Sequence, residues 1–145
     1  MKTEFESVVL ETTFRYMTPF ILVYSVYVLF HGEYIPGGAF QAGGLIGMTV
    51  VLSHLVQEKN PFFFIQIKTA VVLAGMGVFL FIATGVVSMF NSGNFLEFHA
   101  LPFTLNMSDA SRHTLGMTII EIGIAICVAA TIIVIFTALQ RGRKD

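Results

Sequence analysis

Charged residues are scarce in this chain. Of its 145 residues, only 12% are Asp, Glu, Lys or Arg, whereas 55% are hydrophobic. A soluble domain of this size carries about 25% charged residues. The deficit, together with apolar runs of about 20 residues, argues against a soluble domain and predicts an integral membrane protein.

Other absences exclude further classes of function. There is no basic patch, which argues against nucleic acid as a partner. The single cysteine, Cys127, excludes an intrachain disulfide and a C-x-x-C site. The sequence shows no catalytic triad, phosphate loop, dinucleotide fingerprint, or haem or iron–sulfur ligand set. We therefore expect no cofactor and no covalent chemistry, so that the chain is not an enzyme in itself.

Four apolar stretches predict an all-α membrane protein that forms a single membrane domain over residues 1–145. The expected transmembrane helices span about 13–30, 37–57, 64–90 and 114–139. At about 1.5 Å of rise per residue, each is long enough for a hydrocarbon core of about 30 Å. The first twelve residues mix glutamates with apolar residues, a pattern that suits a short N-terminal interfacial helix leading into the first span.

Positive charges predict the orientation of these spans. In a four-span arrangement, only Arg112 falls on one side of the membrane. Seven cations fall on the other side, namely Lys2, Arg15, Lys59, Lys68, Arg141, Arg143 and Lys144. The positive-inside rule then places both termini of this multi-pass chain in the cytoplasm.

Glycines concentrate between the first two spans, in residues 31–45. Non-helical backbone at membrane depth is tolerated only where it is buried in protein or faces water. The break is therefore either a turn at the membrane surface or a tightly packed seam. Gly43 and Gly47 also form a small-xxx-small pair that lets helices approach closely. The expected packing residues are Pro36, Gly37, Gly38, Gly43, Gly44 and Gly47.

Glu121 is the main functional candidate, because it lies about six residues inside the fourth span. A carboxylate in hydrocarbon is costly, so it must face protein or water, have a partner, or be protonated. Two roles are open: a group that relays ions or protons, or a buried hydrogen-bonding group that fixes a neighbouring helix or subunit.

Four other polar residues are candidates for ion translocation. Lys68 lies near the end of a span, where it can instead extend to the lipid headgroups. His54 lies near the end of the second span, where an interhelical hydrogen bond is the alternative role. Without a second histidine at ligand spacing, we expect no metal site there. His31 and Glu33 lie at the mouth of the glycine-rich break, and the alternative for both is a solvated loop.

Two segments resemble the B-subunit family of the Mrp-type multisubunit cation/proton antiporters. The first is similar to the family signature G-H-x-x-P-G-G-G-F-x-G-G and corresponds to residues 32–43, with Glu33, Ala39 and Ala42 as departures from it. The second covers residues 120–128, where Glu121 matches an acidic residue followed by a hydrophobic stretch with glycine.

This resemblance implies a small membrane subunit of a multisubunit sodium/proton antiporter, in contact with other membrane subunits and the lipid bilayer. It implies Na⁺ and H⁺ as the transported ions, although the residues do not separate Na⁺, K⁺ and H⁺. Related subunits also occur in the membrane arms of archaeal hydrogenase-type respiratory complexes. A structural adaptor in such a redox-driven ion pump is therefore the alternative function.

Overall fold

The computed structural model describes residues 4–32, 38–56, 65–90, 93–98 and 108–142. In these residues it has four α-helices: α1 (Glu4–Phe30), α2 (Gly38–Val56), α3 (Ile67–Phe90) and α4 (Asp109–Gly142). Each helix is long and apolar enough to cross a membrane. The prediction of an all-helical chain with four helices capable of spanning a membrane is confirmed.

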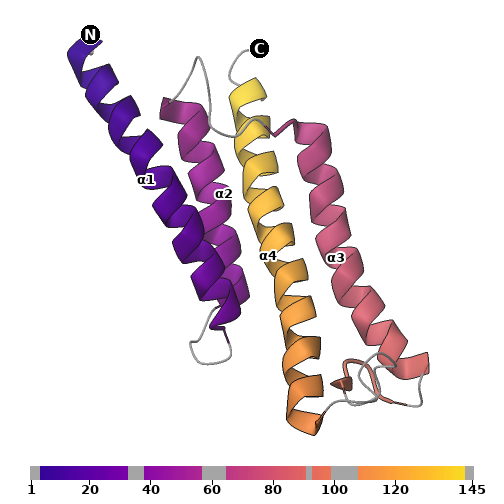
Figure 1. The fold of residues 1–145 in the computed structure, drawn as a ribbon. Coiled ribbons are helices and arrows are strands. Elements are labelled where there is room, and N and C mark those ends of the chain that lie inside the picture. The colour runs from indigo at the N-terminus through magenta and orange to yellow at the C-terminus, as the bar shows by residue number, and fades with distance from the viewer. Residues whose placement is uncertain (1–3, 33–37, 57–64, 91–92, 99–107, 143–145) are drawn as a thin grey trace.

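The helices alternate in direction and lie in the spatial order α1, α2, α4, α3 (Figure 1). Helix α4 packs against both α2 and α3, whereas α1 packs mainly on α2. The start of α1 and the end of α4 lie at the same end of the molecule, which we call the terminal end. The last helix in the sequence is therefore the central one in space.

Small residues bring α2 and α4 together. A methyl group added at Gly43 would lie 2.6 Å from the Ala125 carbonyl oxygen, and one at Gly47 would lie 3.0 Å from that of Ala129. The backbones of α2 and α4 therefore lie in close contact along this seam. Such contact is expected in a membrane, where the hydrophobic effect does not drive helices together. The packing role of Gly43 and Gly47 stays a prediction, and these contacts show where each would act.

A second seam of small residues joins α3 to α4. A methyl group at Gly77 would lie 2.5 Å from the Gly123 carbonyl oxygen and 2.9 Å from the Cβ of Cys127. Gly123 lies two residues from Ala125, about 200° away around the helix. Helix α4 thus has two faces of small residues, and α2 and α3 of the same chain cover one each.

The contact between α1 and α2 contains buried hydroxyl groups. Thr18 and Ser25 on α1 and Thr49 on α2 are at most 3% exposed. Each hydroxyl donates to the carbonyl four residues earlier in its own helix, at 2.8, 2.6 and 2.7 Å respectively. These side chains are therefore small and internally satisfied, which allows close packing without an unpaired donor in the apolar interior.

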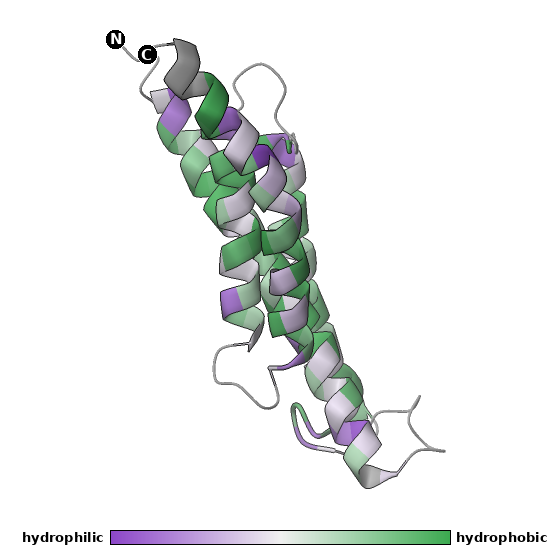
Figure 2. Ribbon diagram, turned by 60° about the vertical axis from the view of Figure 1, so that its left-hand side comes forward, coloured by the Kyte–Doolittle hydropathy of each residue, from purple (hydrophilic) through white to green (hydrophobic). Residues whose placement is uncertain are grey.

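Hydrophobic residues run along the length of the helices (Figure 2), and many large apolar side chains are exposed. Phe20 on α1, Phe79 on α3 and Leu139 on α4 are each about 70% exposed. In water, an apolar surface of this extent would drive association. In a bilayer it faces lipid tails or neighbouring subunits.

The polar ends of two helices differ from the sequence-based expectation. Helix α1 begins at Glu4 and is continuous to Phe30, so the described part of the expected interfacial helix is the beginning of α1 and not a separate element. Pro19 consequently lies in the interior of α1. Helix α4 begins at Asp109, five residues before the expected start of the fourth span. Apolar runs mark only the apolar part of a helix, and both helices extend beyond it.

The segment that follows α3 folds back onto both neighbouring helices. The Phe95 ring occupies the space beside Gly85 of α3, and the Phe98 ring occupies the space beside Gly116 of α4. Leu96, between them, has a φ of 65°, which turns the chain between the two rings. The two rings thus close the packing between α3 and α4 at the end opposite the terminal end.

Candidate functional site

Glu121 lies on α4 at the point where the end of α1 meets the start of α2. A methyl group added at Gly32 would lie 2.6 Å from the Glu121 Oε1 atom and 3.2 Å from its Cδ. The same methyl group would lie 3.2 Å from the Cα of Gly38. The carboxyl group therefore packs on the backbone of Gly32, where only a glycine leaves room for it. It faces protein, as the sequence-based argument required.

Gly32 and Gly38 form what we call the glycine crossing. A side chain at Gly38 would collide with the Cα atom of Gly32 and would lie 3.4 Å from the Val28 carbonyl oxygen. Gly38 is buried, in agreement with its predicted packing role. Glu33, Pro36 and Gly37 were also predicted at this break, and they lie outside the described residues.

Glu121 belongs to the face of α4 that packs on α2. Ala125 and Ala129 follow it at intervals of four residues, so the three lie along one stripe of the helix. These two alanines contact Gly43 and Gly47. Glu121 therefore marks the end of the α2–α4 seam at the glycine crossing. Gly44 has open space around it within this chain, and its packing role stays a prediction.

His31 directly precedes the glycine crossing, but its ring is held by its own helix. The ring stacks on Tyr27 with centroids 4.0 Å apart, and its Nδ1 atom lies 3.0 Å from the Tyr27 carbonyl oxygen. The structure thus brings His31 to the same end of α1 as the Glu121 contact. Its imidazole is anchored one helical turn back along α1.

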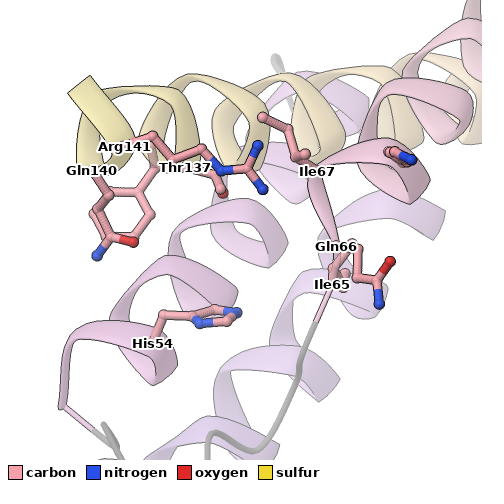
Figure 3. A pocket seen from close by; sticks show the side chains of 9 residues that line it. His54, Ile65, Gln66, Ile67, Thr137, Gln140 and Arg141 are labelled. Carbon is pink, nitrogen blue, oxygen red and sulfur yellow. The ribbon is translucent and has the colours of Figure 1, made fainter. Parts of the chain in front are cut away.

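His54 and Lys68 lie together at the terminal end, far from Glu121. Both line a pocket of about 450 Å³ between the end of α2, the start of α3 and the end of α4 (Figure 3). Thr137 lines the same pocket and is sixteen residues beyond Glu121, or about 24 Å along α4. The predicted ion-translocation residues therefore divide between two places and do not form a single site.

Two contributors to these places were missed by the sequence-based reasoning. Gly32 was noted only as part of a signature, and its contact with Glu121 depends on how α1 and α4 meet in space. Arg141 was used only to orient the chain, yet it lines the terminal-end pocket with His54 and Lys68. The position of Arg141 near the end of an apolar helix could have indicated that it lies at the terminal end of the molecule. Among the described residues, no group of three His, Cys, Asp or Glu side chains is placed to hold a metal ion.

The fold and the glycine crossing define a helical protein of the multi-pass membrane class, with one carboxyl group packed against a backbone crossing. Residues 9–134 match a family described as a domain related to the MnhB subunit of Na⁺/H⁺ antiporter. The chain therefore belongs to the MnhB family, and the resemblance found from its two sequence segments is confirmed.

Individual relatives agree with this assignment. The chain is 26% identical over 130 residues to the Na(+)/H(+) antiporter B-subunit of Bacillus subtilis, covering 86% of this chain and 91% of the relative. It is 28% identical over 137 residues to the protein of the same name from Alkalihalophilus pseudofirmus, with the same coverage. A putative antiporter subunit mnhB2 of Staphylococcus aureus is 26% identical over 140 residues, covering 94% of this chain and 96% of the relative.

No solved structure was found to match the chain. The four helices able to span a membrane and the bacterial relatives identify a multi-pass protein of the prokaryotic cell membrane.

Proposed function

We propose that this chain is a membrane subunit of a multisubunit Na⁺/H⁺ antiporter and that Glu121, at the glycine crossing, takes part in ion transfer. The family assignment and the names of the relatives support the antiporter role. They also favour a transport subunit of an antiporter over the adaptor of a redox-driven complex. Other membrane subunits are the expected partners, and Na⁺ and H⁺ are the expected ions.

The observation that carries the role of Glu121 is its position against the glycine crossing. Its carboxyl oxygen packs against the backbone of Gly32. An acidic residue inside a transmembrane helix is costly to keep ionised. A carboxyl group kept there despite this cost is suited to exchanging a proton or to binding a cation.

The orientation of the subunit forms part of the proposal. Arg15, Lys68 and Arg141 belong to the terminal-end portions of α1, α3 and α4, whereas Arg112 belongs to the opposite end of α4. Short flanking segments rich in Lys and Arg stay on the cytoplasmic side. We therefore assign the terminal end, with both termini, to the cytoplasm. The Glu121 contact then lies toward the outer side of the membrane.

A purely structural role for Glu121 is the competing interpretation, because the same contact also holds α4 against α1. Substitution by glutamine separates the two roles. Glu121→Gln keeps the shape of the side chain but cannot ionise, whereas Glu121→Ala removes both shape and charge. We expect the Gln variant to assemble with its partner subunits and to lose sodium-dependent proton exchange in membrane vesicles.

Glu11→Gln is the matched control for this experiment. Glu11 is an exposed acid near the terminal end of α1, away from the glycine crossing. This variant is expected to assemble and to exchange ions as the unmodified complex does. Full exchange by a stably assembled Glu121→Gln complex, with loss of assembly in the Ala variant, would establish the structural role instead.

A further inference from the structure

The terminal-end pocket is distinct from the glycine crossing, and its lining comes from three helices. It has a volume of about 450 Å³ and lies where the end of α2, the start of α3 and the end of α4 meet (Figure 3). Its lining residues are His54, Ile65, Gln66, Ile67, Lys68, Phe136, Thr137, Gln140 and Arg141. The pocket therefore has polar donors on its wall together with apolar side chains.

The charged residues among the described lining of this pocket all have one sign. Lys68 and Arg141 line it, and His54 adds a group that is cationic when protonated. No acidic residue occurs among the described lining residues. Within the described part of the chain, neither Lys68 nor Arg141 has a carboxylate partner. Two cationic groups that face one cavity without a carboxylate favour an anion in it.

The beginning of α3 adds to this preference. Ile67 starts the helix, and the first backbone hydrogen bond there runs from the Ala70 amide to the Gln66 carbonyl at 3.0 Å. The amide groups of the first turn of a helix carry a positive partial charge directed away from the helix. At the start of α3 this charge adds to those of Lys68 and Arg141.

The chemistry of the lining indicates which anion fits. A guanidinium group binds phosphate oxygens in pairs, and an ammonium group adds a point charge. Gln66, Gln140 and Thr137 provide further hydrogen-bond donors. Ile65, Ile67 and Phe136 provide an apolar wall that suits an acyl chain. The pocket also lies at the end of the apolar helices, at the level where lipid headgroups are found.

We propose that the terminal-end pocket binds the phosphate group of an anionic phospholipid. Basic pockets between transmembrane helices on the cytoplasmic side bind lipid headgroups of this kind. The bound lipid bridges α2, α3 and α4 and holds their ends together. This proposal is independent of the role of Glu121, because the two places are separated by about 24 Å along α4.

Lipid-dependent thermal stability tests the proposal. The full chain in neutral detergent is titrated with phosphatidylglycerol, phosphatidylcholine or inorganic phosphate, and its unfolding temperature is recorded by circular dichroism. A ligand that binds the folded state raises this temperature, and the rise grows with the logarithm of the ligand concentration relative to its Kd. We expect phosphatidylglycerol to stabilise the chain at concentrations where phosphatidylcholine does not.

Substitutions locate the effect. Lys68→Gln with Arg141→Gln is expected to weaken the apparent affinity for phosphatidylglycerol about tenfold or more, since hydrogen bonds to charged groups are lost. Lys68→Arg with Arg141→Lys keeps both charges and is expected to retain most of the binding, and it also controls for folding. Arg15→Gln removes a cation from α1, near the same end but outside the pocket, and is expected to change the affinity less than about threefold.

Three outcomes overturn the proposal. Equal stabilisation by phosphatidylcholine would show that the phosphate is not recognised through its charge. An equal loss of affinity in Arg15→Gln would show general attraction to an anionic surface and not a pocket. Stabilisation by inorganic phosphate without an effect of phosphatidylglycerol would assign the site to a free phosphate. Competition between inorganic phosphate and phosphatidylglycerol would support the phosphate chemistry proposed here.

Discussion

Two consecutive glycines on α2 offer a matched test of how the α2–α4 seam is held. Gly43 faces α4, and Gly44 has no neighbouring atom within 4 Å of the place where a side chain would begin. A methyl group at Gly43 would lie 2.6 Å from the Ala125 carbonyl oxygen and 3.0 Å from the Ala125 Cα. Ordinary contact begins at 3.4 Å, so α4 would have to move by several tenths of an ångström.

The structure sets the size of the expected effect. Replacing glycine by alanine inside a helix stabilises it by about 0.5–1 kcal/mol, and this gain is common to both variants. Only Gly43→Ala has the cost of overpacking, about 1–3 kcal/mol. The difference between the two variants is therefore about 1–3 kcal/mol, or roughly 5- to 140-fold in the unfolding equilibrium.

Reversible unfolding of the purified chain in mild detergent, followed by circular dichroism, measures this difference. Gly44→Ala is expected to be as stable as the unmodified chain or more stable, and Gly43→Ala less stable than Gly44→Ala. Gly47→Ala, whose methyl group would lie 3.0 Å from the Ala129 carbonyl oxygen, is expected between the two. Equal stability of Gly43→Ala and Gly44→Ala would refute the assignment of Gly43 to a close backbone contact.

Three further predictions concern the rest of the chain. Gly85→Ala is expected to destabilise the chain because its methyl group would collide with the Phe95 ring. The double variant with Phe95→Ala is expected to lose less free energy of unfolding than the sum of the two single variants. Ser25→Ala removes a buried hydroxyl that is bonded only to its own helix, so a loss of less than about 1 kcal/mol in the same unfolding assay is expected. In a Cys127→Ser background, a cysteine at Ser108 is expected to react with an impermeant maleimide added outside cells, whereas one at the C-terminus is not.

The number of helices was predictable from the sequence because apolar runs of sufficient length have few alternatives in a membrane. Their polar ends were not. Helix α4 begins at Asp109, where the Ser108 side chain accepts a hydrogen bond from the Ser111 amide at 3.4 Å. Residues 109–113 are mostly polar and lie outside the apolar run. Capping residues mark a helix start, whereas apolar runs mark only the part suited to lipid.

The candidate residues were predictable one by one, but their grouping was not. The position of Glu121 inside an apolar run already marked it as a residue that must face protein. Its contact with Gly32 depends on the register in which the helices pack. The same register brings His54 and Lys68 to one pocket. Residue spacing along one helix defines which side chains share a face. It does not fix which residue of another helix lies opposite.

The stretch between the glycine crossing and the terminal-end pocket limits what this chain can do alone. Residues 39–53 of α2 and 69–90 of α3 contain no acidic, basic or histidine side chain, and residues 122–136 of α4 contain only Cys127 as an ionisable group. The buried hydroxyls of Thr18, Ser25 and Thr49 are bonded to carbonyls of their own helices. About 24 Å along α4 thus separates Glu121 from Thr137 at the edge of the pocket, and about 30 Å separates it from Arg141.

A proton or Na⁺ leaving Glu121 toward the terminal end therefore needs ionisable groups or water that these stretches of α2 and α3 do not supply. Neighbouring subunits are the expected source, in line with the family to which the chain belongs. The purified chain reconstituted alone into vesicles should accordingly show no sodium-dependent proton movement, while the assembled complex shows it and loses it with Glu121→Gln. Exchange by the isolated chain would contradict this division of roles, because it would require a complete ion route within these four helices.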